Sequence, residues 1–368
     1  MSRHAVGVAR ITALIPAHNE EALISAAIRG LLDQSRIPHK IIVVADNCTD
    51  GTVSAVEAMG EPRVFVFETA GNTDKKAGAL NQALGVVLPG LDDDDVVLVQ
   101  DADSILNSDF VGNAAVHLDS DRGLGAVGGT FRAVPSAGDA SLMTRFLVHL
   151  QDNEYARYAR DVRRLKGKCL VVTGTAALFR ASTLRKISAA RVAGTLPSGN
   201  GAGGVYDTTV LTEDNELSFA VMTMGMRILA PSDCLLVTDA MTTWKELWAQ
   251  RLRWKRGAVE NCVQYGFTSV TASYWGRQAL SIAGVLVTAA YLGSLVWSLI
   301  FTGGIVVQPF WLAVTGIFVL ERGITLKDKG TGRRLLAATM YELPYDLFLQ
   351  VIHARAYLDS VFKTKKVW

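Results

Sequence analysis

The sequence predicts an α/β protein with a doubly wound, mostly parallel sheet, followed by an amphipathic interfacial helix and C-terminal transmembrane helices. Val96–Gln100 is a short run rich in β-branched residues, which is typical of a strand buried on both faces. Strand-like runs, polar loops and helical segments alternate four times up to Asp101. A later run, 279–301, contains no charged residue. These patterns predict an α/β domain over 1–242, an amphipathic region over 243–275 and a membrane region over 276–368.

Composition narrows the class of protein. The 368 residues carry a formal net charge of +2, which gives no support to a nucleic-acid partner. The four cysteines are far apart, so they form neither a metal-binding spacing nor a disulfide framework, and a reducing compartment suits them. The first residues contain no long apolar run, so we expect no signal peptide.

The first four strands are expected at 11–15, 41–44, 64–67 and 96–100. Helices are expected over 22–32, from Thr52 onward, and up to Val87. A polar cluster follows each strand, and the carboxyl ends of parallel strands share one sheet edge where ligands bind. The clusters are therefore expected to form one site. The acidic run 92–95 precedes a strand, so it is expected at the opposite edge, in water.

Asp101 and Asp103 emerge at the carboxyl end of the central strand. Two carboxylates in this arrangement can hold a hard divalent cation such as Mg²⁺ or Mn²⁺, which can clamp a diphosphate. The alternative is structural: Asp103 or Ser104 caps a helix that begins near Leu106.

The chain from 126 to 224 continues the α/β pattern. A strand is expected at 126–131, a long helix at 141–164, and a further segment at 171–180. The glycine-rich stretch 194–204 predicts a mobile loop, which leads to Thr212-Glu213-Asp214. Asp214 can cap a helix over 215–224, which is compatible with a further role for its carboxylate.

Residues 243–265 predict an amphipathic, cationic helix. Tryptophans combined with arginines and lysines indicate a helix that lies in a membrane interface. Arg253 can bind two phosphate oxygens, and Trp254 offers a flat apolar face to a sugar ring. An interfacial anchor is the structural alternative for Trp254.

Beyond this helix, transmembrane spans are expected at about 279–301 and 303–320. Residues 335–362 contain several polar side chains, so they form either a third span or an interfacial helix. Basic residues flank the hairpin on one side, which places both its ends and the α/β domain in the cytoplasm. The protein is therefore expected in the inner or plasma membrane.

Six motifs resemble those of family-2 glycosyltransferases with the GT-A fold, of the membrane polysaccharide-synthase type that makes cellulose, chitin or hyaluronan. They occur in the family's order between about residues 10 and 260: Pro16–Glu21, Val44–Thr52, Lys76–Asn81, Asp101–Asp103, Thr212–Asp214 and Gln250–Trp254.

The resemblance implies an inverting transfer that depends on Mn²⁺ or Mg²⁺ and moves a sugar from a nucleotide-sugar to a hydroxyl of a growing glycan. A UDP-sugar is favoured, because the Asp46 carboxylate suits the imide N–H of uracil. Asp214 would be the base and Asp103 the metal ligand. Donor residues would be Pro16, Ala17, Asn19, Glu20, Asp46, Lys76, Asp101, Asp103 and Arg253. Acceptor residues would be Glu213, Gln250 and Trp254.

Structural alternatives remain for several of these residues. Asp46 and Asp50 can close a strand-to-helix loop by Asx-turns, Lys76 can lie on a solvated helix face, and His18 is expected to hydrogen-bond within its loop.

The membrane region departs from the family, whose members have more spans. Two or three helices cannot enclose a wide polysaccharide channel, so a homo-oligomer or polymerisation at the cytoplasmic face are alternatives. Transfer of a single sugar to a lipid is a further possibility, although such enzymes usually lack the Gln-x-x-Arg-Trp motif. An inactive nucleotide-sugar-binding scaffold would require broken motifs, whereas Asp101, Asp103, Asp214 and Arg253 are all present.

Overall fold

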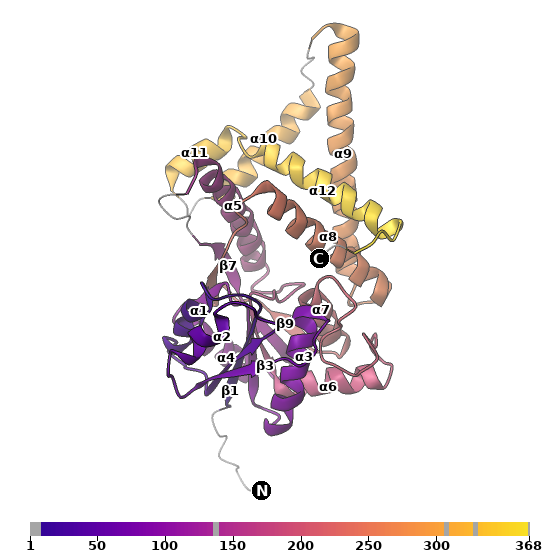
Figure 1. Ribbon diagram of the computed structural model, residues 1–368. Helices are drawn as coiled ribbons and strands as arrows, with labels where there is room; N and C mark the ends of the chain where they lie inside the picture. Colours follow the sequence, from indigo (N-terminus) through magenta and orange to yellow (C-terminus); the bar gives the residue numbers. More distant parts are fainter. Residues whose placement is uncertain (1–8, 135–139, 305–308, 327–329, 367–368) are drawn as a thin grey trace. The chain divides into compact units, whose positions relative to one another are not determined.

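The structure, a computed structural model, describes residues 9–134, 140–304, 309–326 and 330–366 (Figure 1). The chain forms two compact units. The first comprises Met1–Val134 and Asp161–Asp239, and the second comprises Pro135–Arg160 and Ala240–Trp368. The expected domain division after residue 242 stays a prediction. It differs from the two compact units, because the second unit also contains Pro135–Arg160.

The first unit is built on a seven-stranded sheet in the order β3-β2-β1-β4-β8-β6-β9. Strands β1 to β4 are parallel neighbours, whereas β8 runs antiparallel to both β4 and β6. The predicted doubly wound, mostly parallel sheet is therefore confirmed. The strands are β1 (Ile11–Ala17), β2 (Lys40–Ala45), β3 (Val64–Glu68), β4 (Val96–Gln100), β6 (Leu124–Gly128), β8 (Ala176–Arg180) and β9 (Arg227–Leu229).

Apolar residues on both faces hold the centre of this sheet. Leu14 of β1 lies opposite Ile42 of β2 and Val99 of β4, and all three side chains are buried. Each such side chain contributes about 1.5–3 kcal/mol by leaving water. Because the central strands are buried on both faces, the charged residues of this edge follow the strand ends, whereas Thr12 of β1 and Gln100 of β4 are polar residues buried within the strands.

Helices surround the sheet (Figure 1). In α1 the buried residues Ile24, Ala27, Ile28 and Leu31 recur at helical spacing, which turns one face of the helix toward the core. The helices of this unit are α1 (Ile24–Leu32), α2 (Thr52–Glu57), α3 (Lys75–Val87), α4 (Phe110–Ser120), α6 (Ala181–Val192) and α7 (Glu213–Thr223), with a short 3₁₀ helix η1 (Leu88–Gly90).

A second, three-stranded sheet consists of β5 (Ser104–Leu106), β10 (Leu235–Thr238) and β7 (Thr130–Ala133), in that order. The expected single strand over 126–131 is wrong, because the chain leaves β6 and enters β7 at Gly129. A Cβ at Gly129 would lie 2.5 Å from the Phe110 ring, so this close crossing requires glycine. The alternative of a helix cap at Asp103 is also wrong, because β5 follows it directly.

The acidic run 92–95 is not uniformly solvated as expected. Asp92 is exposed, but Asp95 is 4% exposed and accepts hydrogen bonds from the backbone and guanidinium of Arg10. Asp95 therefore fixes the start of β4 to the segment before β1, on the edge opposite to the polar clusters.

The second unit consists of helices. They are α5 (Leu142–Arg164), of which the part up to Arg160 belongs to this unit, α8 (Trp244–Tyr265), α9 (Ala272–Thr302), α10 (Pro309–Thr325), α11 (Thr331–Ala338) and α12 (Leu343–Val361). Helix α8 begins with a capping box, in which Thr243 and Glu246 bond each other's backbone N–H groups. A hydrophobic cluster in the second unit packs Leu147 and Leu150 of α5 against Leu247 of α8 and Tyr345 of α12.

Among the described residues, α9 is the helix that is long and apolar enough to cross a membrane. The expected second span corresponds to α10, which has 17 residues, and residues 305–308 of that expectation lie outside the described part of the chain. The expected element over 335–362 is divided between α11 and α12.

Candidate active site

A cavity of about 210 Å³ lies at the carboxyl edge of the parallel strands. Its walls come from the loops after β1, β2 and β4 and from the first turns of α3. Seven of the nine predicted donor residues line it together with three others: Pro16, Ala17, His18, Glu20, Asp46, Lys76, Ala79, Asp101, Ala102 and Asp103. Asn19 is not part of the wall; its Oδ1 accepts a hydrogen bond from the Thr49 N–H at 2.8 Å and so joins two loops.

Asp46 is 7% exposed at the end of β2. Its Oδ1 accepts hydrogen bonds from Thr69 at 2.7 Å, Asn72 at 2.8 Å and Asn47 at 3.1 Å. Within the described residues these bonds leave Oδ2 for another donor. Asp50, in contrast, accepts from the N–H and hydroxyl of Thr52, which is the Asx-turn expected as the structural alternative.

The loops at this edge adopt left-handed backbone conformations at three residues other than glycine. Asn19, Asn47 and Lys75 have φ angles of 59°, 50° and 54°. Such conformations cost free energy and persist where the surrounding structure holds them, often beside ligand sites. His18 hydrogen-bonds the Asp46 carbonyl through Nδ1 at 2.6 Å, as expected for a histidine that orders its own loop.

Carboxylates gather around the end of β4. Burial, followed by repulsion from Asp103 and Asp101, raises the pKa of Glu20. Burial raises the pKa of Asp103, although hydrogen bonding by Ser104 opposes the rise, and Asp239 adds to it. Burial also raises the pKa of Asp101, to about 6, against the opposing charge of Lys76. A site in which several carboxylates repel one another favours a bound cation.

Asp239 follows β10, and sequence reasoning missed it. The signal was available, because Leu235–Thr238 is an apolar strand that ends at an acid, as Val96–Gln100 does. The antiparallel pairing of β10 with β5 sets Thr238 opposite Ser104, which brings Asp239 near Asp103.

The carboxylates present fit a divalent cation whose remaining ligands are oxygens of a bound diphosphate. Among the described residues, the hydrogen bonds to Asp103 end on Oδ1, from Ser104 at 3.1 Å and Thr238 at 3.4 Å, so Oδ2 is left for another ligand. No group of three or more His, Cys, Asp or Glu residues in this part of the chain forms a complete metal cage. Oxygen ligands from outside the protein would complete such a site.

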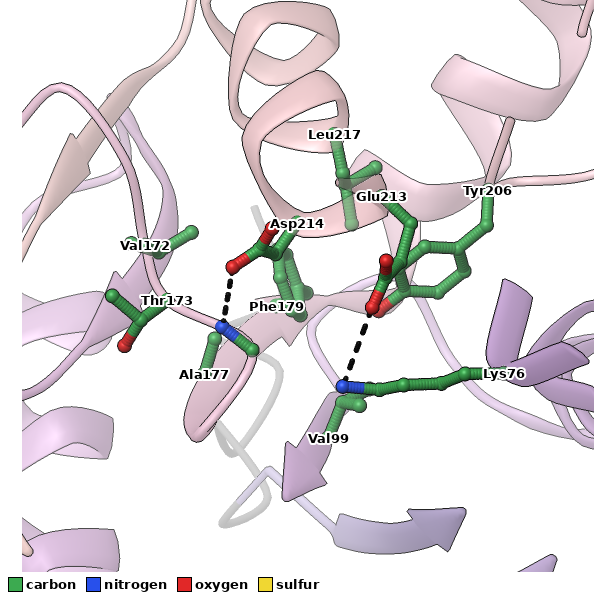
Figure 2. A pocket seen from close by; sticks show the side chains of 11 residues that line it. Lys76, Val99, Val172, Thr173, Ala177, Phe179, Tyr206, Glu213, Asp214 and Leu217 are labelled. Carbon is green, nitrogen blue, oxygen red and sulfur yellow. Dashed lines mark hydrogen bonds and ion pairs between the residues drawn. The ribbon is translucent and has the colours of Figure 1, made fainter. Parts of the chain in front are cut away.

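Lys76 extends from α3 toward the acids of α7. It pairs with Asp101 and lies 3.4 Å from Glu213 Oε1, an ion pair drawn in Figure 2. Burial lowers the pKa of Lys76, but the carboxylates of Asp101 and Glu213 outweigh it and raise the pKa above its usual value. Lys76 is therefore a permanent positive charge, and the alternative of a solvated helix face does not describe it.

Asp214 lies in the first turn of α7, one residue after Glu213. Its carboxylate accepts hydrogen bonds from the backbone N–H of Gly174 at 2.8 Å and of Asn215 at 2.7 Å, and the first of these is drawn in Figure 2. The N-cap of α7 is Thr212, so Asp214 is not the cap residue. Burial and then the neighbouring charge of Glu213 raise the pKa of Asp214.

Tyr206 forms one wall of a smaller pocket that includes Lys76, Glu213 and Asp214 (Figure 2). This pocket has a volume of about 10 Å³, enough for about one water-sized group such as a hydroxyl. Tyr206 is 5% exposed, and Asn81 of α3 bonds its backbone N–H at 2.8 Å and its carbonyl at 2.9 Å. Sequence reasoning missed Tyr206, because a tyrosine after a glycine-rich loop has no distinguishing pattern.

Gln250, Arg253 and Trp254 lie on α8 of the second unit. All three side chains are half-buried. Their predicted roles at the diphosphate and the acceptor stay proposals.

Comparison with known proteins extends this picture. A "Probable glycosyltransferase YdaM" of Bacillus subtilis is 27% identical over 346 residues, covering 88% of this chain and 75% of its own length. The poly-beta-1,6-N-acetyl-D-glucosamine synthase of Staphylococcus aureus is 26% identical over 292 residues. That match covers 77% of this chain, which spans 64% of the length of the synthase.

The structure of a mannosyltransferase from Pyrobaculum calidifontis, PcManGT, in complex with GDP-Man and Mn²⁺, superposes with a TM-score of 0.59. It is 20% identical and covers 98% of this chain and 89% of its own, which shows a common GT-A-like fold. Residues 9–257 match the family described as "Glycosyltransferase like family 2". Because this match covers more than half of the 368 residues, the chain belongs to glycosyltransferase family 2.

Proposed function

We propose that this protein is an inverting, metal-dependent glycosyltransferase that moves a sugar from a UDP-sugar to a hydroxyl of a growing glycan at the membrane. One observation carries the proposal. A single cavity combines a nucleoside-sized space, the Asp46 carboxylate, the Lys76 ammonium and the Asp101 and Asp103 carboxylates, and Lys76 links it to Asp214. A nucleoside diphosphate offers a base N–H to Asp46 and negative charge to Lys76, and a divalent cation would link its phosphates to Asp101 and Asp103.

The donor residues have separate tasks in this proposal. Asp46 Oδ2 accepts the imide N–H of uracil, while Pro16 and Ala17 contact the nucleoside. Lys76, which stays protonated, contributes a point charge to the diphosphate. Arg253 contributes a second, bidentate contact to the diphosphate.

Asp103, with Asp101 beside it, would hold Mn²⁺ or Mg²⁺ through carboxylate oxygens. When bound, the cation neutralises the negative charge that develops on the leaving diphosphate. Asp103 Oδ2 and the mutual repulsion of the acids support this assignment.

Transfer itself is a direct displacement. Asp214 takes the proton of the acceptor hydroxyl, and that oxygen forms a bond to the anomeric carbon from the face opposite to the diphosphate. The bond from the anomeric carbon to the diphosphate breaks, its electron pair leaves with UDP, and the configuration inverts. The Gly174 and Asn215 N–H groups fix the direction of the Asp214 carboxylate. Glu213, Gln250 and Trp254 are proposed to bind the acceptor.

The sugar and the acceptor rest on the relatives. The name of the Staphylococcus aureus synthase favours N-acetylglucosamine, so UDP-N-acetylglucosamine is the first donor to test. We propose that α9 crosses the membrane and that the catalytic unit is cytoplasmic. Arg277 and the arginines of α8 lie before the apolar part of α9. Arg322 lies in the last turn of α10, and Arg333 and Arg334 follow α10, which supports this orientation.

A second candidate is the transfer of a single sugar to a membrane lipid or another membrane-associated acceptor. It is favoured by the one helix, α9, that meets the length and hydropathy of a span in the described part of the chain. One or two spans cannot enclose a polysaccharide, so a polymerase of this kind would need a homo-oligomer or a partner to export its product.

The test is a donor screen on the purified full-length chain with UDP-N-acetylglucosamine, UDP-glucose, UDP-glucuronate and GDP-mannose, followed by sizing of the product. The proposal expects turnover with a UDP-sugar and a polymer as product. A product with one added sugar supports the second candidate instead. Binding of UDP without turnover on any donor would indicate an inactive scaffold.

A further inference from the structure

Arg251 is a buried arginine between two of the proposed acceptor residues on α8. It is 5% exposed, and its guanidinium donates a hydrogen bond to Gln250 Oε1. The same guanidinium lies over the Trp254 ring, with its carbon 4.4 Å from the ring centroid. A cation at this distance from an aromatic face is attracted to it and restricts its rotation.

Glu154 of α5 fixes Arg251 from the other side. Arg251 Nη2 lies 3.0 Å from Glu154 Oε2, and the Tyr345 hydroxyl donates to the same oxygen at 2.6 Å. Burial raises the pKa of Glu154, but the charge of Arg251 and the hydrogen bonds from Tyr345 and Arg251 together outweigh burial and lower that pKa, so the carboxylate stays ionised. Tyr345 is 1% exposed in the core of the second unit.

The side chain of Arg251 is 6% exposed and that of Glu154 is 28% exposed. An ion pair of this kind adds little net stability, because desolvation offsets much of the attraction between the charges. Two well-packed apolar side chains would hold α5 against α8 equally well. Arginine can bind a carboxylate at its edge and cover an aromatic ring with its face at the same time, which lysine and apolar residues cannot do. The pair therefore contributes orientation rather than stability.

We propose that Arg251, anchored by Glu154, is the positioning residue that orients Trp254 and Gln250 for the acceptor glycan. The inference rests on the proposed function, because it takes these two residues as the acceptor-binding pair. Arg251 itself does not touch the acceptor. It acts by holding the indole and the amide, so its loss lowers acceptor affinity and leaves the donor cavity of the first unit unchanged.

The test compares Arg251→Met and Glu154→Gln with Arg256→Met as the matched control. Arg256 is also 5% exposed and lies on α8, but its partners are Glu260 and the backbone at Thr364 and Lys365. With UDP-N-acetylglucosamine as donor and a β-1,6-linked N-acetylglucosamine oligosaccharide as acceptor, we expect both test variants to raise the acceptor KM about tenfold. The dissociation constant of UDP should change by less than about twofold, and Arg256→Met should leave both values near wild type.

The double variant, Arg251→Met with Glu154→Gln, should be no worse than either single variant, because both act through one contact. An acceptor KM that stays at the wild-type value in Arg251→Met, or an equal rise in Arg256→Met, would overturn the inference.

A readout independent of turnover is the ¹⁹F spectrum of protein labelled with 5-fluorotryptophan, with the Trp254 signal assigned by Trp254→Phe. We expect Arg251→Met and Glu154→Gln to shift or broaden that signal and Arg256→Met to leave it in place. An unmoved signal in both test variants refutes positioning by Arg251. If the signal moves but wild-type protein transfers no sugar, the proposed function fails while the coupling of Arg251 to Trp254 stands. Should Arg251→Met fail to fold, Glu154→Gln carries both measurements.

Discussion

Replacing Lys76 by methionine tests the charge balance of the donor cavity. Lys76 is the cation that faces Asp101, Glu213 and Asp214, and methionine keeps most of its length without the charge. A hydrogen bond to a charged group contributes about 1.5–3 kcal/mol, which corresponds to a factor of about 10–150 in a dissociation constant. We therefore expect Lys76→Met to weaken UDP binding in the presence of Mn²⁺ by about that factor.

The cost to folding should be smaller than that of a fully buried pair, about 3–5 kcal/mol, because the side chains of Lys76 and Asp101 are 28% and 29% exposed. Isothermal titration calorimetry with UDP and Mn²⁺ measures the binding loss, and thermal unfolding measures the folding cost. Lys75→Met is the control, since it removes the same charge from an exposed neighbour and should bind UDP within about twofold of wild type. Wild-type affinity in Lys76→Met would refute the assignment of this lysine to the diphosphate.

Three further predictions concern other parts of the molecule. Asp103→Asn, or excess chelator on the wild-type protein, should abolish transfer and remove the Mn²⁺-dependent part of UDP binding, whereas full turnover in chelator would contradict metal dependence. Asn81→Ala removes two hydrogen bonds to the Tyr206 backbone, so it should lower kcat and destabilise the protein by about 1–3 kcal/mol in thermal unfolding. An unchanged kcat would mean that turnover does not depend on these two hydrogen bonds. Burial raises the pKa of Glu342, but Arg157, Arg322 and Asn153 together outweigh burial and lower that pKa, and the pKa of Glu154 is also lowered. Protonation of either carboxylate leaves an arginine without its counter-charge, so the unfolding temperature should fall below about pH 4.5 in wild type and fall less steeply in Glu154→Gln.

Much of the first unit could be predicted from sequence, because its strands are signalled locally. Runs such as Val96–Gln100 are apolar on both faces, and a parallel sheet then places the loops at their carboxyl ends along a common edge. This rule predicted that Asp46 and Asp101 lie in one site, and both residues line the same cavity. It would also have found Asp239, had it been applied to Leu235–Thr238.

Features set by contacts between distant segments could not be predicted. The break at Gly129 depends on the Phe110 ring and on the carbonyl of Cys234, which no local pattern reveals. Tyr206 is placed by Asn81, 125 residues earlier in the chain. Helix α5 was predicted with nearly the right bounds, but its ion pair with Arg251 depends on a partner 97 residues away.

The most direct test of the central claim is single-turnover transfer by Asp214→Asn. The amide keeps the shape of the carboxylate and loses its basicity, so the rate of transfer should fall by about 10²–10⁴-fold. UDP binding with Mn²⁺ should stay within about twofold of wild type, because Asp46, Lys76 and Asp103 hold the donor. Transfer at the wild-type rate would contradict the account and leave Glu213 as the next candidate for the base. A loss of UDP binding as large as the loss of transfer rate would show that donor binding and proton transfer are not divided between these residues as proposed.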